Sequence, residues 1–244
     1  MTEKNYNRQH NISAIQACYG EYVFLPISEY RRLVFDKLIM PLPGGKMADI
    51  GCGPIGWYWS LGYIHKATEL DFYDINIAFL QRSLEGVYQL TPDWLHEEVS
   101  STIDYLDNKG ISARDIARSA AVLHCRGLIH NIHEKPLPKK VDSLLAIESI
   151  EIVDTEDELR TVIENCIDSL LPGGVFSFSV ARFNSADETI IELQSQQLEG
   201  KLNPTLSQIE AIIENCAVSV EYVEQHTVPE KNYEEVILGV VRKK

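Results

Sequence analysis

The chain has 244 residues, with 22 lysines and arginines against 36 aspartates and glutamates, and a net charge of −14. This acidic balance argues against nucleic acid or an anionic membrane as a partner. No apolar run reaches the length of a membrane span, residues 1–9 are polar, and the five cysteines are scattered without a C-x-x-C pair. We therefore expect a cytoplasmic protein with reduced thiols.

Residues 1–45 are expected to form an N-terminal helical cap ahead of the first strand. A short helix is expected over 11–19, and a longer one begins after Ser28 and ends before the Pro-Leu-Pro-Gly-Gly run at 41–45. The aromatic residues Tyr19, Tyr22 and Phe24 could line the mouth of a ligand site or simply pack the cap against the sheet. Both possibilities stay open here.

The chain is organised around residues 46–63, which read as a strand, a glycine turn and a helix. Gly51 and Gly53 permit positive φ and let another molecule approach the main chain. We expect the N–H groups at the start of the following helix to face that space. The turn lacks the G-x-x-x-x-G-K-[ST] pattern of a phosphate-binding loop. It predicts a nucleotide-type site at the carboxyl end of a parallel strand.

The second strand is predicted over 68–74 and ends in an acidic residue. A carboxylate about twenty residues beyond the glycine turn is placed to accept hydrogen bonds from ribose hydroxyls. Asp71 and Asp74 compete for that role, and we favour Asp74 because it ends the strand just before a helix start at Asn76.

Residues 91–120 are expected to form a helical insertion of two helices broken at 107–110, followed by a third strand over 121–124. His124, Cys125, His130 and His133 are close together in sequence, but their spacing matches no structural zinc pattern. No metal site is therefore expected, and these residues are interpreted as loop and rim positions near an adenine.

Residues 141–147 form a nearly continuous aliphatic strand, and Glu148 and Glu151 follow its carboxyl end. A helix is expected over 154–171, a fifth strand over 175–180, a helix over 204–215, and a final strand pair over 218–225 and 236–241. This alternation predicts one α/β domain, a Rossmann-like doubly wound mixed sheet.

The D-x-G-x-G-P sequence at 49–54 resembles motif I of the class I S-adenosylmethionine (SAM) methyltransferases. The layout is most similar to the nicotinamide, phenylethanolamine and indolethylamine N-methyltransferase family. The shared features are an aromatic N-terminal lid, a D-x-[SN] sequence after strand two, an insertion starting near Asp93-Trp94, a V-L-x-C sequence at 122–125, and an acid after strand four.

This resemblance implies that SAM is the cofactor and that a small amine is the methyl acceptor. The sequence departs from the family in two places. Near the adenine, Arg126 stands where the family carries an aspartate, and near the acceptor, strand five ends Val-Ala-Arg-Phe without a carboxylate. The residues implied to contact SAM are Asp49, Gly51, Cys52, Gly53, Pro54, Tyr58, Asp74, Asn76, Cys125 and Arg126.

Glu151 is the candidate for keeping an amine neutral or positioning the acceptor, with Glu148 in reserve. Tyr19, Tyr22 and one of Trp57 or Tyr58 are candidates for walls around the sulfonium, with core packing as the alternative for each. Three hypotheses follow: methyl transfer to a small acceptor, cyclisation of SAM itself to azetidine-2-carboxylate with release of methylthioadenosine, or SAM binding without catalysis. The sequence leaves the oligomeric state open.

Overall fold

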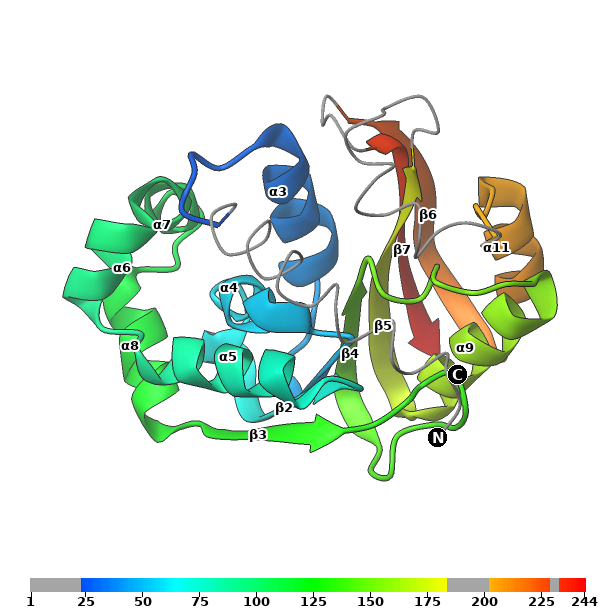
Figure 1. The fold of residues 1–244 in the computed structure, drawn as a ribbon, viewed down its shortest axis with the longest axis horizontal. Helices are drawn as coiled ribbons and strands as arrows, with labels where there is room; N and C mark the ends of the chain where they lie inside the picture. Colours follow the sequence, from blue (N-terminus) through cyan, green and yellow to red (C-terminus); the bar gives the residue numbers. More distant parts are fainter. Residues whose placement is uncertain (1–22, 184–201, 229–232) are drawn as a thin grey trace.

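The computed structural model describes residues 23–183, 202–228 and 233–244. Within this part of the chain, seven strands form one sheet in the order β3-β2-β1-β4-β5-β7-β6 (Figure 1). The strands are β1 (Gly45–Ile50), β2 (Ala67–Asp74), β3 (His124–Ile129), β4 (Val141–Ile147), β5 (Leu170–Phe183), β6 (Val218–Thr227) and β7 (Tyr233–Lys243).

Strands β1 to β5 are parallel to one another, whereas β7 runs antiparallel between β5 and β6. The predicted mixed sheet with a late antiparallel pair is therefore confirmed. Side chains of β4 alternate between two hydrophobic cores, with Leu145 on one face and Leu144 and Ala146 on the other. Both faces are covered, as a continuous aliphatic strand requires.

One face of the sheet carries the helices that follow the first two strands, and the other carries the late helices. The first group comprises η2 (Gly53–Ile55), α4 (Gly56–Ser60), η3 (Ile64–Lys66) and α5 (Ile77–Tyr88). The second comprises α9 (Glu156–Asp168) and α11 (Leu206–Glu214), which pack against β5, β6 and each other. In Figure 1 the two groups lie on opposite sides of the strands.

The described part of the N-terminal region contains the predicted helix after Ser28. It consists of α3 (Glu29–Val34) and a π-helical turn, η1 (Phe35–Ile39), and the Ser28 hydroxyl accepts a hydrogen bond from the Arg31 N–H at 3.3 Å. The helix expected over 11–19 lies outside the described residues. Among the described helices, none is long and apolar enough to cross a bilayer.

The insertion differs from the prediction. It contains three helices, α6 (Pro92–Glu98), α7 (Ser100–Asp107) and α8 (Ala113–Val122), because the chain also breaks at Val99. The strand expected over 121–124 is wrong as well: α8 continues to Val122, and β3 begins at His124. Val122, which is 83% exposed, therefore ends a helix, and the apolar residues before His124 do not form the strand.

Candidate functional site

The candidate site is the region at the carboxyl ends of β1 and β4, which is called the crevice below. Strand β1 pairs with β2 on one side and with β4 on the other, so the chain connections leave β1 in opposite directions at this point. Ligands of doubly wound sheets bind at such switch points. The glycine turn, the end of β2 and the loop after β4 meet there.

The two glycines of the turn serve different steric purposes. Both have positive φ, 58° at Gly51 and 56° at Gly53. A Cβ atom on Gly51 would lie 2.4 Å from the Cβ of Ser149, whose hydroxyl donates to the Ile50 carbonyl at 2.9 Å. A Cβ atom on Gly53 would meet nothing within 4 Å in the described part of the chain. Gly51 therefore allows the loops after β1 and β4 to touch, and Gly53 borders open space.

The main-chain N–H groups of the turn itself are used within the fold. The N–H groups of Gly51 and Cys52 donate to the Tyr73 carbonyl at 2.7 and 3.3 Å, and that of Gly56 donates to the Ser83 hydroxyl at 3.1 Å. The N–H of Gly53 donates to Asp74 at 3.1 Å. Tertiary contacts with β2 and α5 use these donors, so the turn is not prepared to cradle a phosphate.

Asp49 lies in β1 directly beneath the turn and is 2% exposed. Its Oδ2 atom is buried without a hydrogen-bond partner in the described part of the chain. Burial, together with the nearby negative charge of Asp74, raises the pKa of Asp49 well above its usual range. An uncompensated buried carboxylate is costly to ionise, and a cationic group brought to it would remove that cost.

Asp74 ends β2, as predicted, and its carboxylate accepts hydrogen bonds from the main-chain N–H groups of Gly53 and Asn76, at 3.1 and 2.8 Å. Burial raises its pKa despite these bonds. Asn76 caps α5 through the Ala78 N–H at 3.0 Å. Each carboxylate oxygen has a second lone pair, so ribose hydroxyls could still be accepted.

The residues around Asp74 include apolar side chains that the sequence analysis did not single out. Ile75 is 52% exposed at the start of the loop after β2, and Ile129 is 67% exposed at the end of β3, in register with Asp74. Exposed isoleucines at a carboxyl edge suit the faces of a planar base. The signal in the sequence was their position at strand ends rather than their residue type.

Glu148 follows β4 and has a φ of 50°, a left-handed conformation that is uncommon outside glycine. Its N–H donates to the Ser179 hydroxyl at 3.1 Å and to the Ser179 carbonyl at 3.2 Å. Its carboxylate accepts a hydrogen bond from the Tyr30 hydroxyl of α3. Strained residues of this kind are often found at functional sites.

Glu151 is 2% exposed, and one carboxylate oxygen accepts a hydrogen bond from the Ala181 N–H of β5 at 3.4 Å. The other oxygen is buried without a partner among the described residues. Burial and the charge of Glu148 raise the pKa of Glu151 to about 8. A carboxyl group of this kind exchanges its proton near neutral pH, where a general base is effective.

Comparison with known proteins connects this crevice to a fold. No protein-family model matches the chain, and no curated protein matches it in sequence. Among solved structures, the N-methyltransferase NodS from Bradyrhizobium japonicum in complex with S-adenosyl-L-homocysteine matches with a TM-score of 0.57 and 15% identity, over 88% of this chain and 86% of that one. The chain has the class I methyltransferase fold.

Two further structures agree with that assignment of the fold. A SAM-dependent methyltransferase from Methanosarcina mazei matches with a TM-score of 0.55 and 11% identity, over 84% of this chain and 94% of that one. Magnesium protoporphyrin IX methyltransferase from Synechocystis, with bound S-adenosyl-L-homocysteine, matches with a TM-score of 0.52 and 11% identity, over 99% and 95%.

Within the class I methyltransferase fold, two predicted contact residues lie inside β3 and not at its carboxyl end. Cys125 and Arg126 are the second and third residues of β3, in register with Leu70 and Asp71. The Arg126 guanidinium donates twice to Asp71, at 2.6 Å each. Both residues were expected beside an adenine because the third strand was predicted to end near Cys125. Since β3 continues to Ile129, that reason no longer holds.

Tyr58 is also placed in the interior of the fold. It is fully buried in α4, and its hydroxyl accepts from Arg31 at 3.1 Å and shares a hydrogen bond with Thr102 at 2.8 Å. Burial raises its pKa. Tyr58 thus joins α3 to the insertion. Tyr19 and Tyr22 lie outside the described residues, while Cys52 and Pro54 are buried in the turn.

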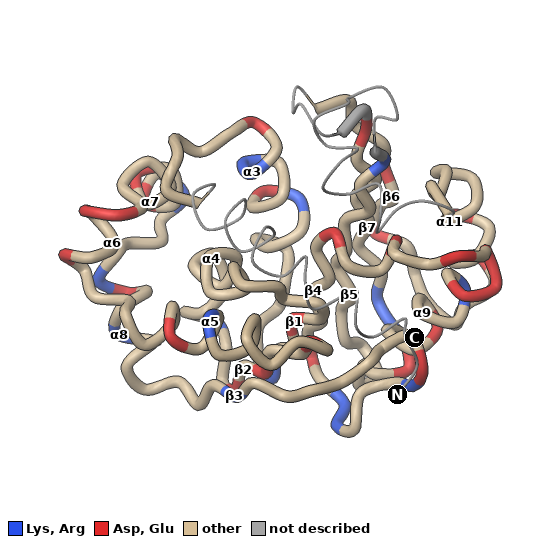
Figure 2. Tube along the Cα trace, viewed as in Figure 1, with Lys and Arg blue, Asp and Glu red and all other residues tan. Residues whose placement is uncertain are grey.

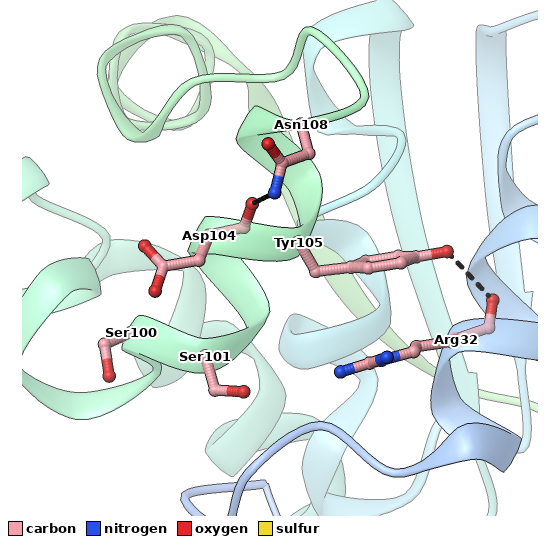
Figure 3. A pocket seen from close by; sticks show the side chains of 6 residues that line it. All are labelled: Arg32, Ser100, Ser101, Asp104, Tyr105 and Asn108. Carbon is pink, nitrogen blue, oxygen red and sulfur yellow. Dashed lines mark hydrogen bonds between the residues drawn. The ribbon is translucent and has the colours of Figure 1, made fainter.

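A separate polar pocket of about 420 Å³ lies between α3 and α7 (Figure 3). Its walls include Arg32 and Tyr105, with the guanidinium carbon 5.7 Å from the ring centre and the tyrosine hydroxyl donating to the Arg32 carbonyl at 3.4 Å. None of the acids of the crevice lines it. Among the described residues, no three His, Cys, Asp or Glu side chains are grouped to hold a metal ion.

Proposed function

We propose that this protein transfers the methyl group of SAM to a small-molecule acceptor, most simply an amine nitrogen. The observation that carries the proposal is the buried, unpartnered Oδ2 of Asp49 beneath the open face of Gly53, in a class I methyltransferase fold. SAM carries an α-ammonium and a sulfonium, and such cations suit a crevice whose converging side chains are acidic.

The residues present fit SAM in three places. Asp49 would hold the α-ammonium group, Gly51 and Gly53 would leave room for the methionine half, and Asp74 would accept from the ribose hydroxyls. Ile75 and Ile129 would contact the faces of the adenine. In this proposal Arg126, Cys125 and Tyr58 support the fold and do not touch the cofactor.

When bound, SAM supplies an electrophilic methyl group on a positively charged sulfur. The protein must then align an acceptor, exclude water and remove a proton from the methylated nitrogen. Glu151 is the candidate for removing the proton, because the raised pKa of its buried carboxylate makes it a stronger base than an exposed glutamate. Glu148 lies beside it and would favour positive charge developing at the acceptor.

Cyclisation of SAM remains the second candidate, because the end of β5 offers no acid to a second substrate. Arg182 occupies that position and forms an ion pair with Glu235 of β7. In this alternative the α-amine of SAM would displace methylthioadenosine from its own γ-carbon, and Glu151 would take the proton that the amine loses.

One set of incubations tests these functions. The purified protein is incubated with SAM alone and with SAM plus a panel of primary and secondary amines, and the products are measured by mass spectrometry. Methyl transfer predicts S-adenosylhomocysteine only when an acceptor is present, whereas cyclisation predicts methylthioadenosine from SAM alone. Saturable SAM binding by calorimetry without either product would contradict both and leave a binding protein.

A further inference from the structure

A hydrogen bond from the N-terminal region reaches the catalytic edge of the sheet. Tyr30 lies in α3, is 1% exposed, and donates its hydroxyl proton to Oε1 of Glu148, which is 118 residues away in the sequence. The sequence analysis did not single out Tyr30. Its position places a buried, oriented donor on the carboxylate of Glu148, three residues before the candidate base in the sequence.

Glu148 is held at both its main chain and its side chain. The two bonds from its N–H to Ser179 fix the left-handed backbone, and Tyr30 fixes the carboxylate. A left-handed conformation costs free energy in a residue with a side chain, so it persists only where surrounding contacts enforce it. The result is a glutamate carboxylate held in one place, and its negative charge acts on Glu151.

We propose that Tyr30 is a positioning residue that holds Glu148 as the ionised member of a carboxylate pair, so that Glu151 carries the proton of the pair. This proton arrangement supports the proposed methyl transfer, and its role in turnover rests on that function. The arrangement itself can be measured without catalysis.

The physical basis is the different surroundings of the two carboxyl groups. A hydroxyl that donates to a carboxylate favours its ionised form, and a fixed negative charge disfavours a second one nearby. Glu151 is the more buried of the two and has one oxygen without a partner in the described part of the chain. Pairs whose surroundings separate their titrations in this way divide acid and base roles.

The other groups around Glu151 do not reverse this assignment. The N–H groups of Ala181, Ile150 and Glu151 itself favour the ionised form, but burial outweighs them. Among the described residues, Glu148 is the charged side chain that acts on Glu151. The guanidinium of Arg182 in β5 forms an ion pair with Glu235. In turnover, Glu151 would first release its proton to solvent and then accept one from the acceptor nitrogen, while Glu148 remained an anion.

The test is a carbon NMR titration of the full-length protein labelled with ¹³C at the glutamate side-chain carboxyl. Glu151→Gln identifies the Glu151 signal by its loss. We expect a titration midpoint of about 8 in the wild type. Glu148→Gln, which removes the fixed charge, should lower the midpoint by about one pH unit or more. Tyr30→Phe, which frees the carboxylate, should lower it in the same direction by a smaller amount.

Tyr105→Phe is the matched control, because it also removes one tyrosine hydroxyl but one that donates to the Arg32 carbonyl in the separate pocket. It should leave the midpoint unchanged. A wild-type midpoint in Tyr30→Phe, with the fold intact by circular dichroism, overturns the positioning role. If the midpoint moves but no amine is methylated, the proposed function fails and the proton arrangement stands. Methyl transfer with an unmoved midpoint overturns this inference alone.

Discussion

Two aspartates on β2, three residues apart, have opposite surroundings. Asp71 lies in the middle of the strand, and the Arg126 guanidinium binds both of its oxygens at 2.6 Å. Asp74 lies at the carboxyl end and accepts hydrogen bonds from main-chain N–H groups. The chain thus supplies a cation to one carboxylate and main-chain dipoles to the other.

The same difference extends across the sheet. At the carboxyl edge, Asp49 and Glu151 each keep a buried oxygen without a partner among the described residues. Acidic residues elsewhere, along α6, α7 and α9, are spread over the surface (Figure 2). We infer that an acid with a structural role, such as Asp71, is paired with a cation of the protein itself. At the crevice, a cationic ligand would supply the partner that the buried acids lack.

The largest expected effect is on turnover. Glu151→Gln should reduce the rate of product formation by roughly 10²–10⁴-fold, the usual contribution of a positioned base, while SAM affinity is retained. The measurement is a steady-state assay with the acceptor identified by the incubations above. Glu164→Gln, on the exposed face of α9, is the matched control and should be as active as the wild type. Full activity in Glu151→Gln would remove Glu151 from the mechanism.

Asp49→Asn tests whether the unpartnered carboxylate of Asp49 binds the α-ammonium group of SAM. It keeps the shape of the side chain but removes the charge that would meet the α-ammonium, so SAM affinity should fall by about 1.5–3 kcal/mol. Because burial already favours the neutral form of Asp49, the variant should melt no lower than the wild type. Calorimetry gives the affinity, with the exposed Asp104→Asn as control. Unchanged affinity would separate Asp49 from the ligand.

Asp74→Ala should weaken SAM binding by about 1–3 kcal/mol, because the ribose hydroxyls would lose their acceptor. The variant also removes the acceptor for the N–H groups of Gly53 and Asn76, so Asp74→Asn is measured beside it to preserve one side-chain oxygen. We expect an intermediate affinity for the asparagine variant. Binding that is equal to wild type in both would take the ribose role away from Asp74.

Arg126→Gln tests whether the ion pair between Arg126 and Asp71 stabilises the fold without contacting SAM. Asp71 would lose a bidentate partner, and since the arginine is partly exposed we expect a loss of about 1–3 kcal/mol in the free energy of unfolding. The melting temperature should drop by roughly 2–4 °C per kcal/mol, with SAM affinity unchanged. Adding Asp71→Asn should recover part of the loss. A clear loss of SAM affinity in Arg126→Gln would return this residue to the site.

The last expected effect is on the pH dependence of stability. The folded state holds the Glu151 proton up to about pH 8, whereas the unfolded chain releases it near pH 4.5. The unfolded state thus binds fewer protons between these values, and this group's contribution to the free energy of unfolding falls as pH rises toward 8. In thermal melts from pH 6 to 9, Glu151→Gln should show a shallower decline. Parallel curves would contradict the raised pKa.

Much of the fold could be predicted because its signals are local. The glycine turn, the acid that ends β2 and the aliphatic strand β4 can each be recognised from a few consecutive residues. Strand β3 could not be placed, since it is an edge strand with polar residues at His124 and Arg126, and an apolar run precedes it in α8. Pairing with a single neighbour leaves little hydrophobic pattern to detect.

The candidate site was predictable only in part, for a related reason. The sequence places Asp49, Asp74, Glu148 and Glu151 at strand ends, but it does not show which donors they meet. The use of the turn's N–H groups by Tyr73 and Asp74 and the bond from Tyr30 to Glu148 join residues at least 21 positions apart. Only the folded chain reveals these contacts.

A crystal structure of the protein with S-adenosylhomocysteine would show whether the crevice binds the ligand. We expect the α-ammonium group within hydrogen-bond distance of Asp49, the methionine half over Gly51 and Gly53, and the ribose hydroxyls on Asp74. A nucleoside bound elsewhere, or a crevice above residues 51–53 filled by the protein's own side chains, would contradict this expectation.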